Sequence, residues 1–208
     1  MKILAHRGAW NVPEEKNTLK SFSCALQNNW GIESDVRDYE GKLVIAHNIA
    51  DAASPNALDV FELWKKSHGE VFAINIKADG LCGKLKEMLE GNGIKSYFCF
   101  DMSVPQMLEY RASGLRYFTR QSEFEKNPVL YEDAAGVWLD AFYDDSWLTN
   151  SLIEQHLGNG KEVCLVSPDL HQRDYNAFWQ RIYDGDFADK DVYLCTDFPA
   201  DAQRFFHK

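Results

Sequence analysis

The sequence predicts a TIM (β/α)8 barrel formed by a single domain that spans residues 1–208. Short apolar segments that suit strands alternate with longer segments of helical spacing, which is typical of parallel βαβ units. Eight such strands occur within 208 residues, a length near the lower limit for this fold. A doubly wound open sheet is the competing architecture, because it shows the same alternation.

Each predicted strand is a short apolar run bounded by turns or polar residues. The eight runs cover 3–5, 31–36, 71–77, 97–100, 117–119, 136–139, 163–166 and 192–195. An additional extended run at 43–46 follows a tight turn and is expected to be an extra strand after the second unit. The first helix is expected to begin after an N-cap at Thr18. Further helices are predicted at 57–66, 81–90, 104–112, 148–157, 175–183 and from Pro199 onward, with Asp197 or a neighbour as the last cap.

The composition is that of an acidic globular protein. Apolar residues make up 45% of the chain and charged residues 26%, and the formal net charge is −10. This charge argues against a nucleic-acid partner, because binding to a phosphate backbone needs a basic surface. A small phosphate-containing ligand stays possible, since a site can be locally basic.

The cysteines indicate a reducing environment. Five occur, at Cys24, Cys82, Cys99, Cys164 and Cys195, and they form no C-x-x-C pair, so zinc and thiol redox sites are not expected. We interpret them as buried free thiols of a cytoplasmic protein. The first apolar run is too short for a signal peptide, and no run approaches the roughly 18 residues of a membrane span.

The segment Glu33-Ser34-Asp35 carries two carboxylates on a predicted strand. Because side chains alternate along a strand, Glu33 and Asp35 point the same way. Two like charges side by side repel and need a cation, a basic partner or open water. The pair therefore indicates either a divalent metal site with oxygen ligands or a solvent-facing strand edge.

Polar residues cluster where the predicted strands end. They are His6, Arg7, Glu33, Asp35, Asn75, Lys77, Asp101, Arg120, Asp140 and Asp197. In a barrel the carboxyl ends of the strands converge on one face, where active sites lie. Solvated loops explain any one of these positions, but less easily a set with paired carboxylates, basic groups and histidines.

An ordered series of motifs resembles the glycerophosphodiester phosphodiesterase family. It consists of His6-Arg7-Gly8, Asn17-Thr18, Glu33-x-Asp35-Val36 and Gly41 to His47, with weaker continuations at 74–77, 100–101 and 196–199. The resemblance implies a TIM barrel of the PLC-like phosphodiesterase type. It also implies a metal-dependent hydrolase that acts on small phosphodiesters in lipid metabolism.

The resemblance assigns roles to individual residues. His6 and His47 correspond to an acid–base pair, Arg7 and Lys77 to residues that stabilise the phosphate charge, and Glu33 and Asp35 to metal ligands. The chemistry is coherent, because phosphodiester cleavage needs neutralised oxygens and proton transfer at the attacking and leaving oxygens. Mg²⁺ and Ca²⁺ are both compatible with such ligands.

Asn75 departs from the family pattern, which has a metal-binding glutamate at this position. Its amide oxygen and Asp101 are expected to complete the metal ligands. Two alternatives follow from this departure and from the chemistry. One is a non-catalytic barrel that binds a phosphate ligand, and the other is a lyase-type phosphodiesterase that forms a cyclic phosphate.

Overall fold

The computed structural model describes residues 1–66 and 70–207. The chain divides into unit 1, made of Met1–Ala5 with Phe118–Lys208, and unit 2, made of His6–Tyr117. The organisation of the chain as one domain stays a prediction. Within the described ranges, no helix combines the length and the apolar character needed to cross a membrane.

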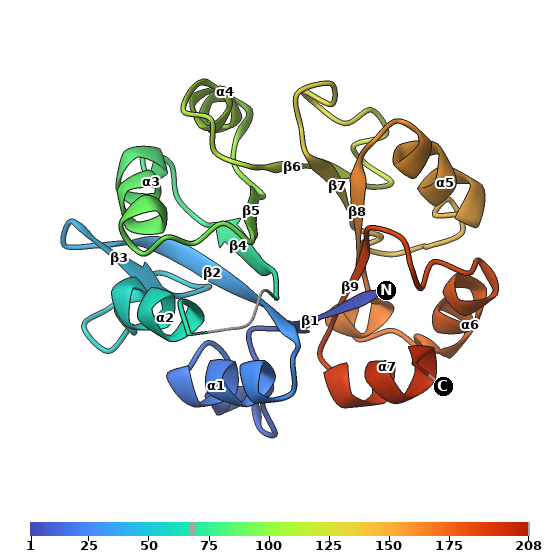
Figure 1. Ribbon diagram of the computed structural model, residues 1–208, viewed down its shortest axis with the longest axis horizontal. Coiled ribbons are helices and arrows are strands. Elements are labelled where there is room, and N and C mark those ends of the chain that lie inside the picture. The colour runs from blue at the N-terminus through green and yellow to red at the C-terminus, as the bar shows by residue number, and fades with distance from the viewer. Residues whose placement is uncertain (67–69, 208) are drawn as a thin grey trace. The chain divides into compact units, whose positions relative to one another are not determined.

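Unit 2 contains a sheet of three parallel strands and one antiparallel strand. The strands are β2 (Gly31–Tyr39), β3 (Lys42–Ile45), β4 (Phe72–Ile76) and β5 (Tyr97–Phe100). β4 lies between β2 and β5 and is parallel to both, whereas β3 pairs with the end of β2 as a hairpin. The helices are α1 (Leu19–Gln27), α2 (Ala57–Trp64), α3 (Cys82–Gly91) and α4 (Val104–Ala112), preceded by the 3-10 turn η1 (Pro13–Glu15) (Figure 1).

The described strands of unit 1 are parallel to one another. They are β1 (Lys2–His6), whose last residue belongs to unit 2, and β6 (Phe118–Gln121), β7 (Gly136–Leu139), β8 (Glu162–Val166) and β9 (Val192–Thr196). Helices α5 (Asn150–Gly158), α6 (Asn176–Asp184) and α7 (Pro199–Phe206) lie on one side of β7, β8 and β9, and the 3-10 turn η2 (Pro168–His171) follows β8 (Figure 1).

The strand order decides between the two predicted architectures. Strands that follow one another in the chain are neighbours from β6 to β9, and the first strand, β1, pairs with the last, β9. At the other end of the series, Cys99 on β5 forms a parallel bridge with Tyr117, directly before β6. This is the order of a TIM barrel, whereas a doubly wound sheet reverses its order at a switch point. The predicted fold class is confirmed.

The helix starts show where local prediction succeeds and fails. Thr18 caps α1 as predicted, because its hydroxyl accepts a hydrogen bond from the backbone N–H of Ser21 at 3.2 Å. Pro199 occupies the first turn of α7, also as predicted. The sequence predicts Asp197 or a neighbour as the cap of α7. The N-cap position falls on the neighbour, Phe198, which makes no side-chain cap bond within the described part of the chain. The backbone N–H of Asp197 instead donates to Asp169.

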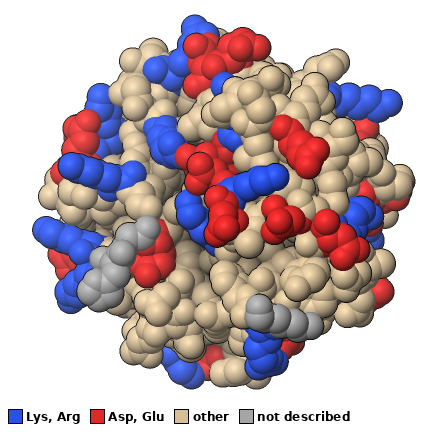
Figure 2. All heavy atoms as spheres, turned by 45° about the vertical axis from the view of Figure 1, so that its right-hand side comes forward, with Lys and Arg blue, Asp and Glu red and all other residues tan. Residues whose placement is uncertain are grey.

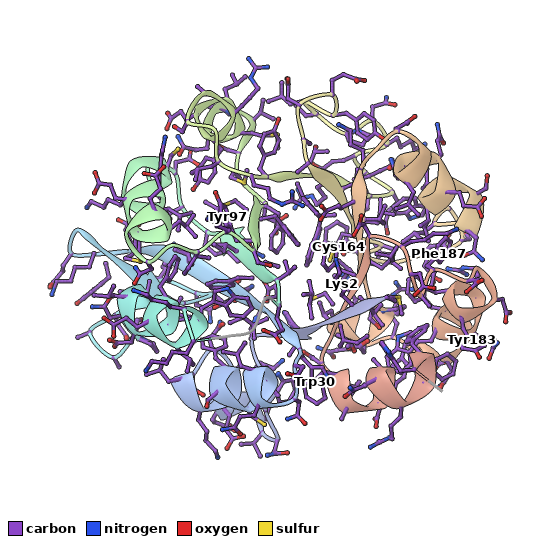
Figure 3. All side chains as sticks on the ribbon, viewed as in Figure 1. Lys2, Trp30, Tyr97, Cys164, Tyr183 and Phe187 are labelled. Atoms are coloured by element: carbon purple, nitrogen blue, oxygen red, sulfur yellow. The ribbon has the colours of Figure 1, made fainter. Side chains whose placement is uncertain are left out.

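Cysteines and aromatic residues contribute to the buried core. Cys82, Cys99, Cys164 and Cys195 are buried as predicted, whereas Cys24 is exposed. Cys164 on β8 and Phe187 after α6 are buried, whereas Tyr183 in the last turn of α6 is exposed (Figure 3). Acidic and basic side chains are interspersed on the face shown in Figure 2.

Gly8 allows the turn after β1 to pack against α1. Its φ is +87°, and a Cβ atom at this position would lie 2.5 Å from Oγ and 2.7 Å from the backbone carbon of Ser21. Gly80 has a similar φ of +81°, but a Cβ atom there would have no described atom within 4 Å. Substitution of the two glycines therefore distinguishes the cost of steric crowding from the cost of backbone strain.

We expect Gly8→Ala to lower the free energy of unfolding by about 2–5 kcal/mol, from left-handed strain plus overpacking. Gly80→Ala is the matched control and should cost only the strain, about 1–2 kcal/mol. Urea denaturation of both variants measures the difference. Equal losses would show that Ser21 moves aside without cost.

His156 on α5 is buried and hydrogen-bonded through both ring nitrogens. Nδ1 lies 2.9 Å from the hydroxyl of Tyr131, and Nε2 lies 2.8 Å from Oε1 of Gln121. Gln121 Nε2 donates to the carbonyl of Lys126, which directs Oε1 toward the histidine. The ring therefore donates through Nε2, accepts through Nδ1 and is neutral, and burial lowers the pKa of His156 below 6.5.

This neutral histidine makes stability fall in acid. Below about pH 6.5 the unfolded chain takes up a proton that folded His156 does not, so the free energy of unfolding decreases by up to about 1.4 kcal/mol per pH unit. In His156→Gln the free energy of unfolding should fall less between pH 7.5 and 5.5 than in the wild type, because the remaining titrating groups are common to both proteins. Urea denaturation at the two pH values measures this difference. An equal fall in the free energy of unfolding in both proteins would contradict the prediction.

Candidate active site

β1 ends beside the carboxylates of β2. The backbone N–H of Arg7 donates to the carbonyl oxygen of Glu33 at 2.9 Å and lies 3.3 Å from its Oε2. Nε2 of His6 lies 3.9 Å from the same Oε2, and 12% of the His6 side chain is exposed. The end of β1 thus brings an imidazole and a basic residue to β2.

Glu33 and Asp35 are buried, with 2% and 0% of each residue exposed. β2 pairs with β4 along this stretch, and Asp35 is in register with Asn75. The alternative of a solvent-facing strand edge is therefore wrong. Because a buried carboxylate without partners costs several kcal/mol, the groups around the two carboxylates define the site.

Asp35 is held by three side chains. Nε of Arg7 lies 3.1 Å from Oδ2, and Nζ of Lys77 lies 3.3 Å from Oδ1. Asn17 donates from Nδ2 to Oδ2 at 2.9 Å. Burial alone would raise the pKa of Asp35, but Lys77, Arg7 and the hydrogen bond from Asn17 outweigh burial and lower it. Asp35 is therefore ionised at neutral pH.

The pKa of Glu33 shifts in the opposite direction to that of Asp35. Burial, followed by the charge of Asp35, raises the pKa of Glu33 to about 7, although His6, Arg7 and Lys77 act against this rise. The two neighbouring carboxyl groups are thus set for different protonation states near neutral pH, a property typical of catalytic sites.

His47 lies on the exposed segment after β3. The N–H of the preceding residue, Ala46, donates to the carbonyl of Asp35 at 3.0 Å, which keeps this segment at β2. Nδ1 of His47 lies 3.1 Å from Oδ1 of Asn48. The charge of His47 contributes to the lowered pKa of Asp35, so the imidazole is within electrostatic reach of the carboxylates.

Asn75 and Asp101 form a polar pair at the ends of β4 and β5. Nδ2 of Asn75 donates to Oδ2 of Asp101 at 3.2 Å. The Oδ1 of Asn75 is buried, and the described residues provide no hydrogen-bond partner for it. A buried carbonyl oxygen of this kind is a suitable ligand for Mg²⁺ or Ca²⁺. However, within 1–66 and 70–207 no group of three or more His, Cys, Asp or Glu side chains is placed to hold a metal ion.

All eight residues assigned to the site lie in unit 2. They are His6, Arg7, Glu33, Asp35, His47, Asn75, Lys77 and Asp101. Arg120, Asp140 and Asp197 lie in unit 1 and have partners of their own there. The sequence did not predict the contact between Asn17 and Asp35, although Asn17 belongs to the Asn17-Thr18 motif.

Solved structures resemble the chain over nearly its whole length. A glycerophosphodiester phosphodiesterase from Parabacteroides distasonis is 16% identical, with a TM-score of 0.76 over 99% of this chain and 96% of that one. A glycerophosphoryl diester phosphodiesterase from the same organism is 9% identical, with a TM-score of 0.73 over 99% and 86%. A Ca²⁺-dependent phosphatidylinositol-specific phospholipase C from Streptomyces antibioticus is 11% identical, with a TM-score of 0.57 over 99% and 95%.

No family model and no curated protein matches the sequence. The TM-scores of 0.57–0.76 show a shared fold, whereas identities of 9–16% do not show a shared activity. The chain therefore shares the TIM-barrel fold of these phosphodiesterases.

Proposed function

We propose that the chain cleaves a small phosphodiester of the glycerophosphodiester type at the cluster around Glu33 and Asp35. The observation that carries this proposal is the pairing of Arg7 and Lys77 with one buried, ionised carboxylate, with His6 beside the other. Two cations, two carboxyl groups of different pKa and an imidazole together match what phosphodiester cleavage requires. The fold shared with phosphodiesterases supports the same activity.

Arg7 and Lys77 are the groups that neutralise the phosphate. Asp35 holds both side chains in place, and both are about one-fifth exposed, so they are open to a ligand. The guanidinium has further N–H groups beyond Nε, which contacts Asp35, and these can donate to phosphate oxygens.

His6 and His47 are the proton-transfer groups. One imidazole removes the proton from the attacking water or hydroxyl, and the other protonates the leaving alkoxide. Oε2 of Glu33 lies 3.9 Å from Nε2 of His6, so a carboxyl group stands beside this imidazole.

A divalent cation, Mg²⁺ or Ca²⁺, fits the chemistry of the oxygen donors. Glu33, Asp35 and the unpartnered Oδ1 of Asn75 would hold it, with Asp101 next to Asn75. When bound, the cation supplies additional charge neutralisation to the phosphate oxygens. Asn75 removes one negative charge relative to a third carboxylate, which weakens the site for a hard cation.

We further propose a cytoplasmic setting in lipid metabolism. The burial of four of the five cysteines within the described part of the chain supports a reducing compartment, where buried thiols persist.

His6→Ala and His47→Ala should each lower kcat for a small phosphodiester by about 10²- to 10⁴-fold, because each removes a proton-transfer group. His207→Ala, an exposed histidine of unit 1, is the control and should keep full turnover. A panel of glycerophosphodiesters assayed by phosphorus NMR also identifies the product. Unchanged turnover in either variant would remove that histidine from the mechanism. A cyclic phosphate product would identify a lyase, and binding without turnover would identify a binding protein.

Asn75→Asp should strengthen cation binding, because the added carboxylate supplies charge and is repelled by Asp101 unless a cation is present. Glu33→Gln should weaken binding, and Glu62→Gln, an exposed carboxylate on α2, should leave it unchanged. Calorimetric titration with Mg²⁺ and Ca²⁺ measures binding without any assay of turnover. Equal affinities in all three variants would place the cation elsewhere or exclude it.

A further inference from the structure

Asn17 connects the loop after β1 to two consecutive residues of β2. Its Nδ2 donates to Oδ2 of Asp35 at 2.9 Å, and its Oδ1 accepts from the hydroxyl of Ser34 at 3.0 Å. Both partners are fully buried. The orientation of the amide is unambiguous, because an ionised carboxylate only accepts hydrogen bonds.

The backbone of Asn17 is held as firmly as its side chain. Its N–H donates to the carbonyl of Arg7 at 2.9 Å, and its φ is +58°. Asparagine tolerates this left-handed conformation better than most residues. The same residue thus bonds to the backbone of Arg7 and to the carboxylate with which the Arg7 side chain pairs.

These contacts distinguish the two oxygens of Asp35. Oδ2 accepts a hydrogen bond from Asn17 and forms an ion pair with Nε of Arg7 at 3.1 Å, whereas Oδ1 forms an ion pair with Lys77 at 3.3 Å. Without the amide, rotation about the Cβ–Cγ bond would cost little, and the carboxylate could turn toward either cation. The hydrogen bond from Asn17 therefore restrains the plane of the carboxylate, and with it the distances at which Arg7 and Lys77 lie from Asp35.

We propose that Asn17 is a positioning residue that fixes the Asp35 carboxylate, with Ser34 fixing the amide of Asn17 in turn. This inference rests on the proposed function, because it assigns Asn17 an effect on turnover through Asp35. Removing hydrogen-bond partners of this kind typically costs 10- to 100-fold in activity or ligand affinity.

The test compares Asn17→Gly with Asn29→Gly. Glycine keeps the left-handed backbone at both positions and deletes only the side chain, and Asn29, with φ of +57°, is exposed at the end of α1. We expect kcat for a glycerophosphodiester to fall about 10- to 100-fold in Asn17→Gly, with a smaller change in KM and an altered pH profile. Asn29→Gly should match the wild type.

Ser34→Ala provides a second, milder variant that keeps the inference testable if Asn17→Gly fails to fold. Its kcat should fall in the same direction, and the double variant should be no slower than Asn17→Gly alone, because both act through one amide. Normal kcat with an unchanged pH profile in folded Asn17→Gly, or in Ser34→Ala if that variant does not fold, would overturn the inference. Additive losses of kcat in the double variant would also overturn the inference.

Nuclear magnetic resonance of the Asn17 side-chain amide separates this inference from the proposed function. Slow hydrogen exchange that becomes fast in Ser34→Ala supports the positioning role whether or not the protein turns over a substrate. An amide that exchanges as fast as a free asparagine in the wild type overturns it. Absence of any turnover by the wild type counts against the proposed function alone.

Discussion

The site in unit 2 depends on how the protein compensates two carboxylates buried on one strand. Glu33 and Asp35 lie on β2 with almost no exposure, where each charge would cost several kcal/mol without partners. Asp35 is compensated by Arg7, Lys77 and Asn17 and stays ionised. Glu33 has weaker compensation, and its pKa rises to about 7. One strand thereby carries two carboxyl groups with different chemistry.

Two of the residues that contact Asp35, Arg7 and Asn17, lie in the loop between β1 and α1 and determine its conformation. Arg7 and Asn17 both adopt left-handed backbone conformations, and Gly8 leaves no room for a side chain beside α1. The Ser21 hydroxyl donates to the carbonyl of Arg7, and the N–H of Asn17 donates to the same carbonyl. Local strain is tolerated here because it brings a guanidinium and an amide to a buried carboxylate.

Asn75 leaves the site with one negative charge fewer than a third carboxylate would give it. It lies in register with Asp35, and its amide contacts Asp101 while its oxygen is buried. Near β2 the positive charges of Arg7 and Lys77 already offset Asp35. A phosphodiester would therefore meet a site in which two side-chain cations carry much of the neutralisation, and any divalent cation would have fewer charged ligands than three carboxylates provide.

The alternation of apolar strands with helices determined the fold class from sequence alone, because burial and periodicity are local properties of the chain. The motifs also placed the candidate site residues at predicted strand ends, and these residues lie in unit 2. Tertiary structure alone decided that Glu33 and Asp35 are buried, that their pKa values differ, and that Asn17 contacts Asp35. It also decided that Phe198 is the N-cap residue of α7 and that the N–H of Asp197 donates to Asp169. These features depend on contacts between residues distant in sequence, and the energies of such contacts are set by burial and geometry that no local pattern records.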